Sequence, residues 1–249
     1  MDIKQNINQS CQVFDKDLQR PEYNRLLSDD EQLAALVKMM DIQPGCRYLD
    51  LATGNGYIAF ELAQKFKSSL IDGLDITPKT IELNQAKQQE LGLDNLSFMA
   101  FDGIKYPFET LTFSGIVTRY AFHHFPDPTS SLNEISRILK PGGFFLICDP
   151  YTLDDDDNGF IDRFQKIRPD GHIHFYKQNE LKELLTNHGF YESHRFYNQI
   201  TYPRKMNNQY LDLIKMTPAS VLDRYEVKVV NDEVFITTQV MNILFSKQD

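Results

Sequence analysis

The chain has 249 residues, of which 41% are hydrophobic and 24% charged, and its formal net charge is −9 at pH 7. This composition is typical of a folded globular protein and argues against wholesale disorder. A chain with this charge repels a phosphate backbone, so we expect no nucleic-acid partner.

No segment has the roughly 18 to 20 consecutive apolar residues of a membrane span, and the opening segment MDIKQNINQS lacks the apolar core of a signal peptide. We therefore expect a cytoplasmic protein without a membrane span. Cys11, Cys46 and Cys148 are odd in number and widely spaced, which favours reduced thiols over a disulfide framework or a zinc site.

Residues 1–45 are expected to form helices that lie over the front of a sheet. Ser28 and Glu31 have the spacing of a capping box ahead of a helix at 29–40. Segment 1–28 is polar and has few apolar anchors, so we expect an active-site lid that becomes ordered when ligands bind.

From residue 47 onward, short β-like runs alternate with helical patterns, which indicates βαβ units and a parallel sheet covered by helices. The expected strands are 47–52, 69–75, 96–100, 113–119 and 143–149, and the expected helices between them are 57–67, 78–91 and 128–139.

After residue 150 the pattern changes. A helix is expected near 179–188, followed by two β-rich stretches at 190–201 and 233–246 with a helix-like segment, 206–215, between them. We expect the two stretches to pair as an antiparallel hairpin with a long excursion.

In YLDLATGNGYIAF, residues 48–60, a hydrophobic strand runs into Gly54 and Gly56 and then into an amphipathic helix. Glycines here let the backbone approach a ligand at the carboxyl edge of a sheet. The segment also fits the loose dinucleotide pattern GxGxxA, with Asp75 placed for a ribose. Asp50 distinguishes between two candidate ligands, S-adenosyl-L-methionine and a dinucleotide. A carboxylate attracts the amino group and the sulfonium of the first and repels the pyrophosphate of the second. The pattern favours S-adenosyl-L-methionine, and an NAD(P)-dependent oxidoreductase is the alternative.

Four segments carry a resemblance to a known family: DLATGNG at 50–56, LDIT at 74–77, TRYAFHHFPDP at 118–128 and EISRILKPGGFFLICD at 134–149. They resemble the class I S-adenosyl-L-methionine-dependent methyltransferases, most of all the branch containing the ubiquinone and menaquinone methyltransferases. The resemblance covers about residues 30–190. It implies an α/β fold: a Rossmann-like, doubly wound, mostly parallel seven-stranded sheet with a C-terminal antiparallel hairpin and an N-terminal helical lid.

The resemblance also implies which residues hold the cofactor, whose product is S-adenosyl-L-homocysteine. Asp75 should accept both ribose hydroxyls, and Ile76 should flank the adenine. Asp102, followed by Gly103, should meet the exocyclic adenine amine, although a turn cap is the alternative for Asp102. The residues expected at the methionine end are Asp50, Ala52, Thr53, Gly54, Gly56, Arg119 and Tyr120. Ala52 stands where the family has its first loop glycine, a small change.

No repeat or long linker divides the chain, so we expect a single methyltransferase domain over 1–249. Its expected parts are the lid at 1–45, the cofactor-binding core at 46–150, and substrate-side helices with the β-hairpin at 151–249.

His123 and His124 are the candidate catalytic residues, because the resemblance places them at the mouth of the active site. Methyl transfer mainly needs alignment, desolvation and, for some acceptors, removal of a proton, which an imidazole accepts near neutral pH. Only one of two adjacent side chains easily faces a pocket, and we favour His124. Alternatively, one histidine caps the turn before Pro126 and the other packs against the next helix.

Two further segments bear on metals and substrate. DGHIHFY, 170–176, places His172 and His174 on one side of an extended segment, so one of them is a candidate for the substrate pocket and the alternative is an exposed loop. LDDDDNGFIDRFQ, 153–165, partly matches an EF-hand loop, but Gln165 stands at the closing glutamate position. We expect no metal there, but an acidic turn that caps a helix near 159–167.

The acceptor is expected to be a small molecule. The fourth strand ends in TRYA and lacks the [Asp/Asn]-Pro-Pro-aromatic pattern of enzymes that methylate nucleic-acid bases. A cofactor-binding module without catalysis stays open, as does the choice between monomer and homodimer. Aromatic residues expected to cover the pocket favour an apolar or aromatic acceptor. They are Phe14, Tyr23, Phe122, Tyr151, Phe175 and Tyr176.

Overall fold

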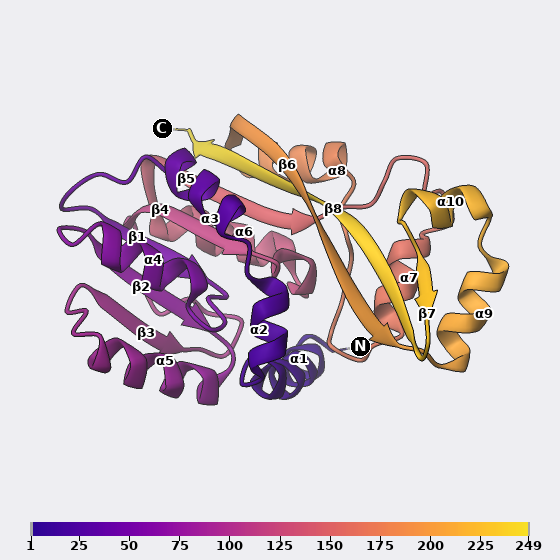
Figure 1. Cartoon of the computed structure of the whole chain (residues 1–249). Coiled ribbons are helices and arrows are strands. Elements are labelled where there is room, and N and C mark those ends of the chain that lie inside the picture. The colour runs from indigo at the N-terminus through magenta and orange to yellow at the C-terminus, as the bar shows by residue number, and fades with distance from the viewer. Residues whose placement is uncertain (1, 249) are drawn as a thin grey trace.

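The computed structural model describes residues 2–248, and an eight-stranded sheet lies at its centre (Figure 1). The strand order is β3-β2-β1-β4-β5-β8-β6, and β7 pairs with β8. Strands β1 to β5 are parallel, and β8 runs antiparallel to both β5 and β6. The strands are β1 (Arg47–Leu51), β2 (Leu70–Asp75), β3 (Leu96–Ala100), β4 (Phe113–Arg119), β5 (Leu139–Pro150), β6 (Phe190–Lys205), β7 (Lys228–Val230) and β8 (Glu233–Lys247).

Helices cover both faces of this sheet because its strands are apolar on both sides. Tyr48 packs into the cluster on one face, and its neighbour Leu49 packs into the cluster on the other. The first face is covered by α3 (Asp30–Met39), α4 (Tyr57–Lys65) and α5 (Pro78–Glu90). The second is covered by α6 (Pro128–Ile138) and α8 (Gln178–Thr186).

The hairpin of β6 and β8 extends past the parallel strands to a third hydrophobic cluster, at the right of Figure 1. Helices α7 (Phe160–Lys166), α9 (Asn208–Met216) and α10 (Ala219–Arg224) pack there. The predicted hairpin with a long excursion is confirmed. The short elements α10 and β7 were not predicted, because six and three residues carry little periodicity.

Helices α1 (Ile3–Asp17) and α2 (Pro21–Leu27) lie across the carboxyl edge of the parallel strands (Figure 1). The capping box predicted from Ser28 and Glu31 is wrong. Asp29 is the N-cap of α3 and accepts a 2.9 Å hydrogen bond from the backbone of Gln32. The Ser28 hydroxyl instead donates to the Asn24 carbonyl, because Ser28 is the C-cap of helix α2.

The parallel half of the fold agrees with the predicted strands and helices to within a few residues. Strand β5 is longer than expected, since pairing with β4 already begins at Leu139. None of the helices between residues 2 and 248 is both long and apolar enough to cross a lipid bilayer.

Candidate active site

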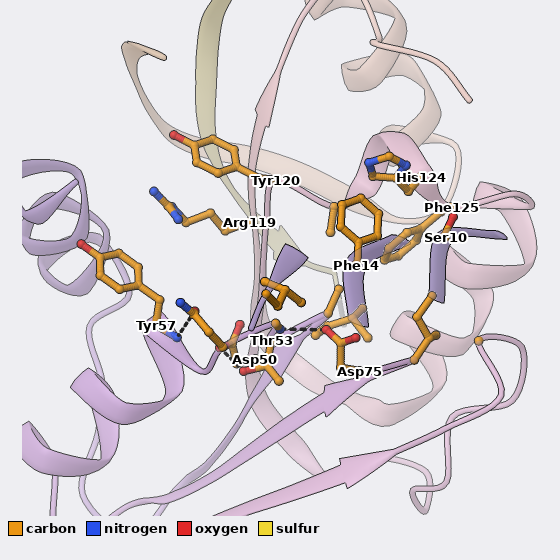
Figure 2. A pocket seen from close by; sticks show the side chains of 18 of the residues that line it. Ser10, Phe14, Asp50, Thr53, Tyr57, Asp75, Arg119, Tyr120, His124 and Phe125 are labelled. Atoms are coloured by element: carbon orange, nitrogen blue, oxygen red, sulfur yellow. Dashed lines mark hydrogen bonds between the residues drawn. The ribbon is translucent and has the colours of Figure 1, made fainter. Parts of the chain in front are cut away.

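A cavity opens where β1, β2 and β4 end, and α1 and α2 form its outer wall (Figure 2). We call it the strand-end cavity; it contains about 1170 Å³ of space, its mouth included. Ten predicted site residues line it: Asp50, Ala52, Thr53, Gly54, Asp75, Ile76, Gly103, Arg119, Tyr120 and His124. Gly56, Asp102 and His123 do not.

The loop from β1 to α4 turns through backbone conformations that favour glycine. Ala52, Gly54 and Gly56 have φ values of 58°, 52° and 76°. A Cβ on Gly56 would lie 2.7 Å from the Phe60 ring, so this glycine lets the loop pack on α4 and does not face the cavity. A Cβ on Gly54 would lie 3.3 Å from Leu18, which follows α1, on the cavity side.

Asp50 is a buried carboxylate at the end of β1. One oxygen, Oδ2, accepts hydrogen bonds from the Thr53 hydroxyl at 2.7 Å and from the Ala59 backbone at 3.1 Å. Within residues 2–248, no hydrogen bond reaches the other oxygen. Burial raises the pKa of Asp50 to about 7, more than these hydrogen bonds lower it. The carboxylate therefore has one unused acceptor oxygen and a reason to attract a cation.

Asp75, at the end of β2, fixes the loop from β1. Its Oδ2 accepts from the Gly54 backbone at 2.7 Å, and its Oδ1 accepts from the Thr77 backbone at 3.0 Å and from the Thr77 hydroxyl at 2.7 Å. Burial raises the pKa of Asp75 above its ordinary value. Each carboxylate oxygen has two acceptor positions, so one position, on Oδ2, remains for a further donor.

Arg119 connects the end of β4 to the N-terminal helices. Its Nε donates to Gln32 Oε1 at 2.8 Å, and its Nη2 donates to the Leu27 carbonyl at 2.6 Å. The guanidinium lies 5.1 Å from the Tyr57 ring centre and 4.1 Å from that of Tyr120 (Figure 2). The hydrogen bond to Leu27 holds helix α2 of the outer wall against the sheet.

Ile76 and Gly103 meet α1 at another part of the wall. A Cβ on Gly103 would lie 3.0 Å from Ile7 and 3.2 Å from Ile76. Asp102 is exposed, and its Oδ1 accepts from the backbones of Ile104 and Lys105. In this conformation Asp102 therefore caps a turn outside the cavity, and its predicted contact with adenine stays a prediction.

A second cavity adjoins the first and contains about 610 Å³, its mouth included. We call it the histidine cavity, because His123, His124 and His172 line it. Of the two neighbours on the short helix η1 (Phe122–His124), only His124 lines the strand-end cavity, as expected, but both His123 and His124 line the histidine cavity. The residues shared by the two cavities are Phe14, Tyr23, Leu27, Tyr120 and His124.

Asp149, at the end of β5, orients His123. The carboxylate lies 2.8 Å from His123 Nδ1 and also accepts a 2.9 Å bond from the His123 backbone. We assign the proton of this bond to Nδ1, with Asp149 as the acceptor, which leaves a lone pair on Nε2; burial raises the pKa of Asp149 well above its usual value. Burial lowers the pKa of His123 well below its usual value, so the ring is neutral at pH 7.

His124 lies between the two cavities and is half-buried. Its ring centre lies 4.9 Å from that of Phe14 and 4.1 Å from that of His123. Its Nδ1 has no hydrogen-bond partner in residues 2–248. Burial, followed by the neighbouring His123, lowers the pKa of His124 well below its usual value.

Asp162 of α7 joins the two histidines of the 170–176 segment. It accepts from His172 Nε2 at 2.7 Å and from His174 Nδ1 at 2.6 Å. Burial alone would raise the pKa of Asp162, but these hydrogen bonds outweigh it and hold the pKa below its ordinary value. His172 lines the histidine cavity, whereas His174 lies outside it and contacts Glu180 at 3.0 Å.

Asp156 of the acidic run 154–157 caps helix α7, as predicted. Asp156 accepts from the backbones of Phe160 and Ile161 at the start of α7, at 2.7 and 3.0 Å. Across residues 2–248 we find no cluster of His, Cys, Asp and Glu side chains that could hold a metal ion.

Sequence reasoning missed several residues of the histidine cavity and its surroundings. Asp149 could have been identified from the sequence. It lies at the end of β5, beside the end of β4, and His123 follows β4 in the chain. No sequence pattern indicated Arg168 and Arg204, since only the folded chain brings them together. Of the predicted pocket aromatics, Phe14, Tyr23 and Phe175 line the histidine cavity, whereas Phe122, Tyr151 and Tyr176 do not.

Comparison with known proteins gives consistent matches. Residues 42–214 match the family model described as a methyltransferase domain. An uncharacterized methyltransferase of Bacillus subtilis, YcgJ, is 27% identical over 174 residues, 70% of this chain and 68% of that protein. A Thermus thermophilus demethylmenaquinone methyltransferase is 30% identical over 151 residues, 59% of this chain and 68% of that protein. The YcgJ crystal structure covers 89% of this chain and 100% of its own, with a TM-score of 0.76 at 20% identity.

Proposed function

The chain belongs to the methyltransferase domain family and uses S-adenosyl-L-methionine as methyl donor, and from that premise we propose that it methylates a small molecule in the histidine cavity. The observation that carries the proposal is the shared wall: Phe14, Tyr23 and His124 line both cavities. A donor in one cavity and an acceptor in the other would meet there. The oxidoreductase alternative has no support among the relatives.

The strand-end cavity fits this cofactor in several respects. Asp50 offers its unused oxygen to an ammonium group, and Gly54 and Gly103 carry no side chain where α1 closes over the loops. Asp75 keeps one acceptor position, on Oδ2, for a ribose hydroxyl. When bound, S-adenosyl-L-methionine supplies a methyl group activated by its sulfonium.

The chain's own residues then align the acceptor and keep water out. Helices α1 and α2 cover the strand-end cavity, and the hydrogen bond from Arg119 to the Leu27 carbonyl holds α2 to the sheet. Excluding water favours an in-line displacement, because charges interact more strongly in a dry site. The predicted lid role of segment 1–28 is part of this proposal.

Where the acceptor must lose a proton, His123 is the better placed of the two candidate bases. Asp149 fixes its ring and directs its Nε2 lone pair away from the carboxylate. The ring is neutral at pH 7 and therefore able to accept a proton. His124, which the sequence favoured, borders both cavities but has a buried Nδ1 without a partner, so we assign it to the wall.

Titration calorimetry tests the proposal. S-Adenosyl-L-homocysteine should bind and NADH should not. Asp75→Ala should weaken binding by about 2 to 3 kcal/mol, because charge-assisted hydrogen bonds are lost. Asp94→Ala, at an exposed acid before β3, is the control and should bind normally. Equal affinity in the Asp75 variant would remove this carboxylate from the site.

A further inference from the structure

Two arginines line the histidine cavity, and they differ in their partners. Arg168 is neutralised, because it forms ion pairs with Asp17 and with Asp170, the latter at 3.3 Å. Arg204 forms no ion pair with any carboxylate of residues 2–248. One cation in this cavity is thus balanced and the other is not.

The hydrogen bonds of Arg204 leave part of its guanidinium unused. Its Nη1 donates to the Pro203 carbonyl at 3.1 Å, and its Nη2 donates to Gln165 Oε1 at a long 3.3 Å. Its Nε is buried and has no partner in the described chain. The group lies 4.5 Å from the centre of the Tyr202 ring, which positions it. A partly buried cation with a spare donor is costly unless an anion completes it.

The rest of the cavity agrees with an anionic ligand. Asp170 is the one carboxylate among its described lining residues, and Arg168 already pairs with it. His123 and His124 are neutral because burial lowers their pKa values. Among the lining side chains, the charge of Arg168 is therefore balanced and that of Arg204 is not, although the whole chain carries −9. The remaining wall is mostly apolar, with Leu26 and Ile200 among its residues.

We propose that Arg204 binds an anionic group of the methyl acceptor, so that the acceptor is a small acid with an apolar or aromatic body. A planar guanidinium recognises a carboxylate or a phosphate by paired hydrogen bonds. The acid group would lie at Arg204, and the apolar body would extend along Phe14 and Phe175 toward His124. This inference rests on the proposed function of the two cavities.

The test compares acids with neutral analogues in the full chain saturated with S-adenosyl-L-homocysteine. Benzoate, cinnamate, hexanoate and phenyl phosphate are titrated calorimetrically, with the three matching amides and phenol as neutral partners. We expect at least one acid to bind roughly 10- to 100-fold more tightly than its neutral partner, as a charge-assisted contact implies. The phosphate arm distinguishes a phosphate preference from a carboxylate preference.

Arg204→Gln should abolish this preference, and Arg204→Lys should retain part of it because the charge remains. Lys205→Gln makes the same change in charge at an exposed neighbouring position and should leave the preference intact. All three variants should bind S-adenosyl-L-homocysteine normally, since neither residue lines the strand-end cavity; this also shows that each variant is folded.

Acids that bind no better than their neutral partners throughout the panel, or an unchanged preference in Arg204→Gln, would overturn the inference. Failure of the wild-type chain to bind S-adenosyl-L-homocysteine would instead overturn the proposed function. The two failures are therefore distinguishable.

Discussion

The two cavities are built in different ways. The strand-end cavity has its inner wall at the ends of β1, β2 and β4 and on the loops that follow them, so its charged residues Asp50, Asp75 and Arg119 lie at strand ends. The histidine cavity joins α1, α2, the segment 165–175 and the end of β6. Parallel strands bring their carboxyl ends to one edge in any such sheet, whereas the second cavity depends on tertiary contacts specific to this chain.

The cavities also differ in charge. Asp50 and Asp75 supply carboxylates to the strand-end cavity, and Arg204 supplies an unbalanced cation to the histidine cavity. A cationic donor and an anionic acceptor would thus be sorted to opposite sides of the wall formed by Phe14, Tyr23 and His124.

The largest expected effect is on ligand binding in the strand-end cavity. Gly54→Val should abolish S-adenosyl-L-homocysteine binding, because a branched side chain opposes the φ of 52° and enters the cavity beside Leu18. Gly92→Val is the control, since Gly92 has a φ of 61° but open space around it. Both variants suffer similar backbone strain, and only the first should lose binding by calorimetry while circular dichroism remains native. Retained affinity in Gly54→Val would mean that this loop does not hold the cofactor.

The second effect concerns pH. Because burial raises the pKa of Asp50 to about 7, the carboxylate is mostly protonated at pH 6 and mostly ionised at pH 8. If it binds the ammonium of the ligand, affinity for S-adenosyl-L-homocysteine should rise about tenfold over this range. Asp50→Asn should bind more weakly and without this pH dependence. A flat wild-type profile between pH 6 and 8 would exclude the contact.

A third, smaller effect concerns the pH dependence of stability and involves His174. Hydrogen bonds to Asp162, and then to Glu180, raise the pKa of His174 to about 9, above its usual 6.5. The folded state therefore gains stability that is complete below pH 6.5 and is lost as the pH rises to 9. We expect a loss of about 1 kcal/mol in urea unfolding, a small value because the ring is partly exposed.

His174→Gln should remove that loss, and His194→Gln, at an exposed position on β6, should keep it. An identical pH profile for the wild type and His174→Gln would show that the contacts with Asp162 and Glu180 contribute nothing to stability.

The smallest effect tests the departure from the family's glycine pattern. Ala52 adopts a φ of 58°, which is strained for a residue with a Cβ. Ala52→Gly should therefore stabilise the fold by about 0.5 to 1 kcal/mol, as measured by urea unfolding. Ala63→Gly, inside helix α4, makes the same chemical change and should destabilise by about 1 kcal/mol. A loss of stability in Ala52→Gly would contradict the assigned strain.

Local sequence patterns predicted the parallel half of the fold well, because strand and helix periodicities there are strong and the turns contain glycine or proline. Helix α3 shows the limit of such reasoning, since Ser28 and Asp29 are both good caps and only the end of α2 decides between them. Most of the predicted site residues do line the strand-end cavity, because the same local patterns that predicted the strands also located their ends.

The histidine cavity was less predictable. Nothing local indicates that Arg168 pairs with Asp17 of α1, or that Arg204 pairs with no carboxylate of residues 2–248. These properties depend on contacts between segments far apart in the sequence. The cytoplasmic location stays a prediction, and the choice between monomer and homodimer stays open.

Hydrogen–deuterium exchange with and without saturating S-adenosyl-L-homocysteine tests most directly whether the strand-end cavity is the cofactor site under an N-terminal lid. Residues 50–57 and helices α1 and α2 should gain protection, because the ligand would lie between them. The distant segment from α9 to β7 should not change. Unchanged exchange at 50–57 and in α1, with ligand bound, would contradict the account.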